Sequence, residues 1–293
     1  ESLIPTEPVP LAGYGARKGA NFEGVDDTIF VKAVVFDNEI TKAAYVSMDL
    51  LIVPPNLDHQ KILDKLSFEV DNLYLTASHT HSSIGGYLEG LAGKIFGGEY
   101  SEDILEFLTN KTILALEEAY YKREKSRIGY GRIYASNFVT NRLVGDSIGT
   151  YDPFIRLIKI NTESGKNAAI FSYAAHATCY GHKQRDLSGD YPGTLTSMLE
   201  MTREIDFAVY GAGAVGSMSP RTKSAEGEKR VKEISYGLFE KIYEGFRIMG
   251  AKYETKLISK KINIELREES FRVTKNIIVR PWIFKLLVGE SPK

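Results

Sequence analysis

Hydrophobic and polar residues follow two periods along this chain, one typical of strands and one typical of helices. Alternating, β-branched stretches predict strands over 28–37, 42–48, 72–77, 127–134, 154–161, 168–173 and 206–210. Apolar residues spaced three and four apart predict helices over 56–68, 101–124, 190–203 and 226–248, and the pattern over 256–280 is strand-like again. Mixed strands and helices indicate an α/β fold, and we expect layered mixed β-sheets flanked by helices, an α/β/β/α-type sandwich.

Composition and charge narrow the class of protein. The 293 residues are 43% hydrophobic and 11% aromatic, which suits a large core and excludes a mainly disordered chain. The 37 basic and 38 acidic side chains leave no positive excess to neutralise phosphates, so we expect no nucleic-acid partner. The most apolar stretch, 276–289, contains Arg280 and Lys285 and is shorter than the roughly 20 residues of a membrane span, so we expect no transmembrane segment.

The chain shows no linker or repeat, and we expect residues 1–293 to form a single domain. It begins at Glu1 rather than Met, so either a leader has been removed or the chain has been trimmed; with a removed leader, we expect a secreted or periplasmic protein. The last residues close no element, so we expect the domain to continue past Lys293. Cys179 is the only cysteine, so these residues form no disulfide or cysteine-based zinc site. The sequence does not indicate an oligomeric state.

Four polar motifs come directly after predicted strands. They are Asp49 after 42–48, His79 and His81 after 72–77, His176 after 168–173, and the glycine-rich loop 211–216 after 206–210. In open α/β sheets, ligands bind outside the carboxyl ends of the strands. We therefore expect the four motifs to share one site.

The three histidines are the main candidates for chemistry. Residues two apart in extended backbone point to the same side, so His79 and His81 could face one cleft. Neutral imidazole is a favoured zinc ligand, and catalytic zinc commonly has three protein ligands and a water. Two hydrogen-bonded loop residues, and a core position for His176, are the alternative. Gly85 and Gly86, followed by Tyr87, would let the backbone approach a substrate closely.

Three charged residues are candidates for supporting roles. Arg142 is either a surface charge paired with Asp146 or Asp152, or a fixed cation that orients a substrate or stabilises an oxyanion. Asp190 is either the N-cap of the helix that follows it or a partner of a metal-bound histidine, and Asp49 is open to the same second role.

The loop 211–216 fits the G-x-G-x-x-G dinucleotide fingerprint, but its surroundings do not. That fingerprint opens a helix at once, whereas residues 217–220 intervene here and the next helix is predicted only from about Glu226. A tight loop that presents Ser217 or Ser219 is the better interpretation. Neither serine lies in a G-x-S-x-G elbow, so a serine-hydrolase triad has little support.

Taken together, the motifs resemble the N-terminal catalytic domain of the neutral/alkaline non-lysosomal ceramidase family. The matching segments, in family order, are 11–15, 46–49, 76–87, 141–142, 176–178, 188–190 and 216–220. Members are zinc-dependent amidases that cleave the N-acyl bond of ceramide to a sphingoid base and a fatty acid. The resemblance therefore implies a Zn2+ cofactor, a small lipid-like substrate and a peripheral contact with a membrane.

The resemblance also implies a role for individual residues. His79 and His176 would be zinc ligands, and His81 would lie beside the metal, facing the leaving group. Zinc would activate a water for attack on the amide carbonyl, while Arg142 and Ser219 would stabilise the oxyanion and His81 would pass a proton to the amine. Direct attack by Ser219, with His81 as its base, is the alternative mechanism.

The sequence departs from the family pattern at several positions. Ile84 stands where proline is usual, Ser217 where aspartate is usual, and Arg221 where asparagine is usual. The family completes its zinc shell with a Glu and a Tyr from further along the chain, and the surroundings of Glu290 do not match that motif. We therefore expect the remaining ligands beyond Lys293.

These departures leave the substrate open. A hydrolase of another N-acyl or ester substrate and a non-catalytic lipid- or glycan-binding protein are the alternatives to a ceramide hydrolase. The glycine-rich segment 87–98, which contains Leu88, Leu91, Ile95 and Phe96, would be an apolar lining or lid, or else an ordinary surface loop.

Overall fold

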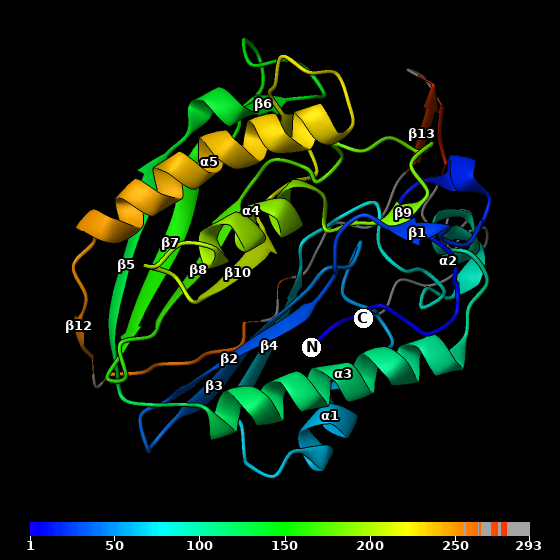
Figure 1. The fold of residues 1–293 in the computed structure, drawn as a ribbon. Helices are drawn as coiled ribbons and strands as arrows, with labels where there is room; N and C mark the ends of the chain where they lie inside the picture. Colours follow the sequence, from blue (N-terminus) through cyan, green and yellow to red (C-terminus); the bar gives the residue numbers. More distant parts are fainter. Residues whose placement is uncertain (255, 263, 265–270, 275–276, 280–293) are drawn as a thin grey trace.

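The structure, a computed structural model, describes residues 1–254, 256–262, 264, 271–274 and 277–279. Four layers are stacked in it: two helices, a five-stranded sheet, a three-stranded sheet, and two further helices (Figure 1). The prediction of layered mixed β-sheets flanked by helices, the α/β/β/α-type sandwich, is therefore confirmed. No helix among the described residues has the length and apolarity that a membrane span requires.

The larger sheet has the strand order β10-β8-β7-β5-β12 and the smaller one β2-β3-β4. Their bounds are β2 (Val31–Asp37), β3 (Lys42–Met48), β4 (Asn72–Ala77), β5 (Ser126–Tyr134), β7 (Phe154–Thr162), β8 (Asn167–Tyr173), β10 (Phe207–Ala212) and β12 (Lys252–Tyr253). Two neighbouring pairs, β3 with β4 and β8 with β10, are parallel. Each parallel pair places two carboxyl ends at one sheet edge, and the four polar motifs follow these four ends.

Helices cover the outer faces of both sheets. On the larger sheet lie α4 (Asp190–Glu200) and α5 (Glu228–Ile248), and on the smaller sheet lies α3 (Glu102–Tyr121), with α1 (His59–Lys65) beside it (Figure 1). The side chain of Asp58 accepts hydrogen bonds from the amides of Gln60 and Lys61 and so caps α1. That cap explains why this helix begins three residues later than the predicted range 56–68.

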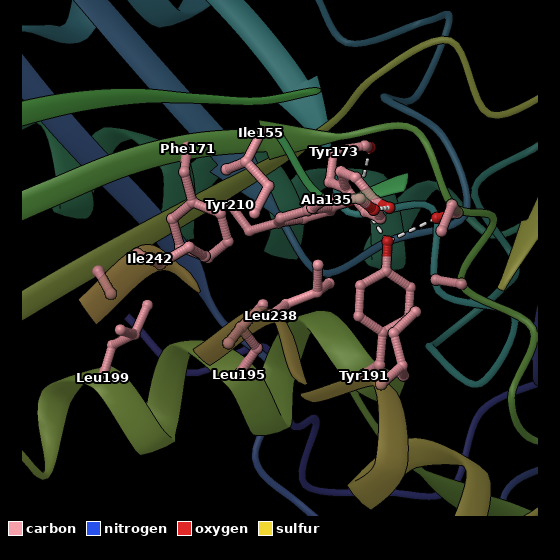
Figure 2. Packing of buried hydrophobic residues seen from close by; sticks show 14 of the residues in the cluster. Ala135, Ile155, Phe171, Tyr173, Tyr191, Leu195, Leu199, Tyr210, Leu238 and Ile242 are labelled. Atoms are coloured by element: carbon pink, nitrogen blue, oxygen red, sulfur yellow. Dashed lines mark hydrogen bonds between the residues drawn. The ribbon is translucent and has the colours of Figure 1, made fainter. Parts of the chain in front are cut away.

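Three apolar clusters fill the three gaps between the layers. Side chains alternate along each strand, so β8 directs Phe171 towards α4 and α5 and Ile170 towards the smaller sheet. In the smaller sheet, β2 likewise directs Val31 towards α3 and Val34 towards the larger sheet. Figure 2 shows the first cluster, in which Phe171 packs near Leu195, Leu238 and Ile242. Both sheets are thus apolar on both faces, which is what a four-layer stack requires.

The predicted strands 42–48 and 72–77 are confirmed, and the other long elements differ from their predicted ends by one to three residues. Short elements that the sequence did not predict are η1 (Gly15–Arg17), β1 (Gly24–Val25), α2 (Gly90–Gly97), η2 (Ser136–Phe138), β6 (Val139–Asn141), β9 (Asp186–Leu187), β11 (Met218–Pro220) and β12. The prediction over 256–280 lies partly outside the described residues; within it, β13 (Phe271–Thr274) pairs antiparallel with β14 (Ile277–Val279).

Packing between α5 and the larger sheet can be tested with one pair of substitutions. Leu238 has no exposed surface, whereas Leu114 on α3 is 51% exposed. We expect Leu238→Ala to lower the free energy of unfolding by about 2–5 kcal/mol, because it leaves a cavity in the core. Leu114→Ala, the matched control, should lower it by less than about 1 kcal/mol. Urea unfolding of both variants measures the difference, and equal losses would contradict this packing.

Candidate metal centre

Three histidine side chains meet beyond the carboxyl ends of β4 and β8. His79 and His81 follow β4, and His176 follows β8. The Nε2 atom of His176 lies 3.0 Å from Nε2 of His79 and 2.9 Å from Nε2 of His81. Within the described part of the chain, these three residues are the group of His, Cys, Asp or Glu side chains compact enough to hold a metal ion.

The second nitrogen of each ring fixes where its proton lies. The Nδ1 atoms of His79, His81 and His176 face the backbone carbonyls of Leu51 at 2.6 Å, Gly13 at 3.1 Å and Val215 at 3.0 Å, respectively. A carbonyl oxygen can only accept, so each Nδ1 carries the proton and each neutral ring leaves a lone pair on Nε2. The short contacts between Nε2 atoms are therefore not hydrogen bonds between neutral rings. Three lone pairs that converge in this way repel one another unless a cation lies among them.

Burial keeps the three imidazoles neutral. Desolvation is the largest cause that lowers the pKa of His81 to about 3 and the pKa of His176 to about 4, and it also lowers the pKa of His79. The positive charge of Arg142 further lowers the pKa of His79 and of His176. A proton is thus disfavoured at neutral pH, and neutral imidazole is the form that binds a metal.

The two separations from His176 come close to those of a tetrahedral site, and all three donor atoms lie within 4.8 Å of one another. Nitrogens at about 2.0–2.1 Å from one zinc ion, at tetrahedral angles, lie about 3.3–3.4 Å apart. The separations in the structure, 2.9 and 3.0 Å, are shorter by a few tenths of an ångström, which small ring rotations can supply. Neutral imidazoles suit zinc, copper, iron and nickel. The three histidines can therefore hold a metal ion, but their geometry does not select which one.

His79 has a left-handed backbone, with φ at 63°, which residues other than glycine seldom adopt. The sequence predicted an extended segment in which His79 and His81 face the same way. The two rings do converge, with centroids 5.1 Å apart, but through this left-handed turn rather than through a continued strand. The flanking side chains of Ser78 and Thr80 are buried, and together with the bond to Leu51 they hold the strained conformation in place.

The loops that follow β3 and β10 both reach the histidines, although the Asp49 carboxylate itself does not, because it accepts from the amide of Phe30. The loop after β3 supplies the Leu51 carbonyl, and the loop 211–216 after β10 supplies the Val215 carbonyl. The latter loop continues into β11 instead of a helix, so it lacks the helix N-terminus on which a dinucleotide site depends. Its contact with His176 gives the glycine-rich segment a different role.

A fifth segment, near the N-terminus, was not predicted as part of the site. The Gly13 carbonyl accepts from His81, and the ring of Tyr14 lies 4.9 Å from the His81 ring. Gly13 has φ at 110°, and a Cβ there would lie 2.6 Å from the His81 Cα, so only glycine permits this approach. A backbone carbonyl carries no signal in the sequence. The resemblance over 11–15 was the one indication that this segment matters.

Asp49 and Asp190 bind backbone amides, and neither carboxylate bonds to a histidine ring within the described residues. Asp190 is fully buried and accepts from the amides of Cys179 and Tyr180 at 2.9 and 3.0 Å, which fixes the turn after His176. Asp49 accepts from the amide of Phe30 at 2.9 Å. Desolvation raises the pKa of both carboxyl groups, and these hydrogen bonds oppose the shift. The N-cap of α4 is Gly189, so Asp190 is instead the first residue of the helix.

Buried tyrosines support the neighbouring residues of His176. The hydroxyl of Tyr191 donates to the carbonyl of Ala175 at 2.5 Å and lies 2.8 Å from the hydroxyl of Tyr210 (Figure 2). The hydroxyl of Tyr210 in turn donates to the carbonyl of Tyr173 at 3.0 Å. The turn that presents His176 is therefore tied to the main core on one side and to Asp190 on the other.

Arg142 directly follows β6, which pairs antiparallel with β11. Its Nε and Nη2 atoms donate to the carbonyl of Gly216 at 3.1 and 2.8 Å, and its amide donates to Ser217 at 2.9 Å. The surface pairings considered for it do not occur, because Asp146 pairs with Arg221 and Asp152 with Arg156. Arg142 is thus anchored to the loop that also holds His176.

Ser219 lies in β11, opposite Thr140 of β6, and is half-buried. Within the described residues its hydroxyl makes no hydrogen bond. The two nitrogens of His81 face Gly13 and His176 instead. The serine–histidine contact that a directly attacking Ser219 would use is therefore not among the contacts described here.

Comparison with known proteins establishes the family to which the chain belongs. Residues 5–237 match the family described as neutral/alkaline non-lysosomal ceramidase, N-terminal. The chain belongs to this ceramidase family. It is 24% identical to neutral ceramidase A of Dictyostelium discoideum over 242 residues, which are 73% of this chain and 34% of that protein.

Solved ceramidase structures share the fold. A ceramidase complexed with C2 superposes with a TM-score of 0.73 at 21% identity, covering 83% of this chain and 42% of that one. The neutral ceramidase from Pseudomonas aeruginosa gives 0.72 at 21% identity, covering 83% and 43%. The chain therefore spans about a third of the curated relative and about two fifths of each solved chain.

In this member of the ceramidase family, Gly85 and Gly86 pack against the chain itself. A Cβ on Gly85 would lie 2.1 Å from the carbonyl oxygen of Gly97, and the amide of Gly86 donates to that same carbonyl at 2.7 Å. Tyr87 has no exposed surface. A role of these three residues in substrate binding stays a prediction, and the side chain of Tyr87 would have to leave the core to fulfil it.

The glycine-rich segment that follows forms α2, with Leu91, Ile95 and Phe96 about half exposed. A Cβ on Gly93 would collide with the backbone of Leu88, so this glycine serves close packing. The amide of Gly13 donates to the carbonyl of Phe96 at 2.8 Å. Through Gly13, α2 is therefore connected to the segment that holds His81.

The close packing of Gly85 gives a second test. We expect Gly85→Ala to lower the free energy of unfolding by about 1–3 kcal/mol, because the added methyl group meets a backbone carbonyl that cannot rotate away. Gly250→Ala is the matched control, since a Cβ at Gly250 meets nothing within 4 Å. Thermal or urea unfolding of the two variants measures the effect. A Gly85→Ala variant as stable as the control would show that α2 does not pack on Gly85.

Proposed function

We propose that this chain is the metal-binding part of a zinc-dependent amidase that hydrolyses the N-acyl bond of ceramide or a related N-acyl lipid. The observation that carries the proposal is the convergence of three unprotonated Nε2 atoms, at 2.9 and 3.0 Å, in a chain of the ceramidase family. Because the chain spans about a third of its curated relative, the activity is proposed for the full-length protein.

His79 and His176 are the proposed zinc ligands. Their Nδ1–H groups are held by the carbonyls of Leu51 and Val215, so each ring presents its lone pair without a rotamer change. Zinc bound there would supply a Lewis acid for the amide carbonyl and lower the pKa of a bound water towards neutrality. The described histidines leave room in the shell for ligands from the rest of the protein.

His81 is proposed to transfer a proton during the reaction. Its Nε2 lies at the same point as those of the two proposed ligands, and its Nδ1–H is fixed by Gly13. With the lone pair directed at that point, His81 would hold a proton taken from water only transiently, because burial lowers its pKa to about 3, and would pass it on to the leaving amine. The same geometry suits a third zinc ligand, and zinc affinity separates the two roles: His81→Gln lowers it strongly only if His81 is a ligand.

Arg142 is proposed to stabilise the oxyanion of the tetrahedral intermediate. Its guanidinium is anchored by Gly216, and its positive charge acts on both proposed ligands. Ser219 is proposed to assist by donating a hydrogen bond to the same oxyanion. The contacts of His81 favour this role over direct attack by Ser219, because neither His81 nitrogen faces that hydroxyl.

Metal content and turnover of the full-length protein test the proposal together. We expect about one zinc per chain by elemental analysis and release of fatty acid from an N-acyl sphingosine. The double variant His79→Ala/His176→Ala should lose both, because two of the ligands are gone. His59→Ala is the matched control: His59 is exposed on α1, and this variant should keep both zinc and turnover.

Three results would count against the proposal in different ways. Wild-type protein that stays free of metal in excess zinc would rule out the zinc-dependent mechanism. Bound zinc with hydrolysis of esters but not of N-acyl amides would move the substrate to the alternative class. Tight lipid binding with neither zinc nor turnover would indicate a binding protein on a ceramidase scaffold.

A further inference from the structure

Arg17 ends the short helix η1 and is 6% exposed, so its guanidinium is buried beside the histidines. All five of its N–H directions are used. Nε donates to the carbonyl of His182 at 3.3 Å, Nη1 to those of Ala12 at 2.9 Å and His81 at 2.5 Å, and Nη2 to the carbonyl of Gln184 at 2.9 Å and the hydroxyl of Ser82 at 3.4 Å. One side chain thus connects three loops that are far apart in the sequence.

No carboxylate accompanies this buried cation among the described residues, and every acceptor it contacts is neutral. Desolvation lowers the pKa of Arg17 to about 10, so the group stays charged at neutral pH. Burying an unpaired charge is unfavourable, and an apolar side chain would fill the same space without that penalty. What an apolar side chain cannot supply is a rigid, planar fork of donors aimed at five fixed points.

Two of these hydrogen bonds and one further contact of Arg17 lead to His81. Arg17 binds the His81 carbonyl directly, and it binds the carbonyl of Ala12, the residue before the Gly13 that accepts from the His81 ring. Its guanidinium also lies 4.9 Å from the ring of Tyr14, and that ring lies 4.9 Å from the His81 ring. The backbone, the ring nitrogen and the ring face of His81 are therefore all held by groups that Arg17 contacts.

We propose that Arg17 is a positioning residue of the metal centre. It holds the His81 ring so that its Nε2 atom stays close to those of His79 and His176. This inference rests on the proposed function, because Arg17 would affect turnover only by positioning His81, whose role in the reaction is itself proposed. A purely structural role would be different: loss of Arg17 would then loosen the fold without any special dependence on His81.

A double-mutant cycle in the full-length enzyme separates the two roles. Arg17→Met is expected to lower kcat by about 10–100-fold with little change in KM, in the range found when groups that orient metal-site histidines are removed. In a His81→Gln background the same substitution should lower kcat by no more than about twofold, because the residue it positions is already gone. Arg17→Lys, which keeps the charge but not the fork, should fall between wild type and Arg17→Met.

Chemical modification of the metal-free protein tests the positioning role of Arg17 without a measurement of turnover. Diethylpyrocarbonate modifies accessible imidazoles, and mass spectrometry resolves each site. Arg17→Met should raise the modification rate of His81 several-fold relative to that of His59, which lies exposed on α1, outside the histidine cluster. Arg185→Met is the matched control: Arg185 lies in the same loop as Gln184 but pairs with Glu23, and its loss should leave both kcat and the rate at His81 unchanged.

The possible results distinguish a failure of the positioning role from a failure of the proposed function. Additive losses in the cycle, or equal changes in modification at His81 and His59, would overturn the positioning role while leaving the proposed function intact. A wild-type protein with no metal and no turnover would overturn the proposed function and this inference with it. If Arg17→Met does not fold, Arg17→Lys decides: wild-type kcat and wild-type modification of His81 in that variant would overturn the inference.

Discussion

Three imidazole lone pairs directed at one point are the constraint around which this end of the molecule is organised. Each ring is held by a backbone carbonyl that accepts from its Nδ1, so none can relieve the repulsion by moving its proton to Nε2. Burial makes protonation unfavourable as well. A metal cation among the three Nε2 atoms would resolve the conflict, and the surrounding loops hold the rings in a position that could bind one.

The four-layer stack explains why these loops meet. The carboxyl ends of β3 and β4 lie at one edge of the smaller sheet, those of β8 and β10 at one edge of the larger sheet, and the two sheets pack face to face. Two histidines therefore come from one sheet and the third from the other. The N-terminal segment crosses the junction and contributes Gly13 and Arg17 from outside both sheets. The packing of the two sheets thus creates both the apolar layer between them and the polar site at their edge.

The layered fold and the three histidines could be predicted from the sequence, and there is a physical reason why their partners could not. Strand alternation and post-strand polarity pointed to the layered fold and to His79, His81 and His176, because side-chain identity carries both signals. The carbonyls of Leu51, Gly13 and Val215 could not be predicted, since every residue has a carbonyl and only tertiary structure aims it. Arg17 was missed because a basic residue in a loop is normally a surface charge.

The glycines show a subtler limit. Gly85 and Gly86 were interpreted as room for a substrate, yet the group that approaches them is the Gly97 carbonyl of the chain itself. Helix α2 escaped prediction for a related reason: three of its eight residues are glycines, which are poor helix formers, and packing rather than propensity stabilises it. A glycine in the sequence indicates that another group approaches the backbone closely, but it does not indicate which group that is.

The most direct test of the account is anomalous diffraction at the zinc edge from crystals of the full-length protein. We expect one peak about 2.0–2.1 Å from the Nε2 atoms of His79 and His176, with Nε2 of His81 directed at the same point. The Nδ1 atoms should still face Leu51, Gly13 and Val215. A zinc-loaded crystal with its peak elsewhere, or with either proposed ligand bound through Nδ1, would contradict the account.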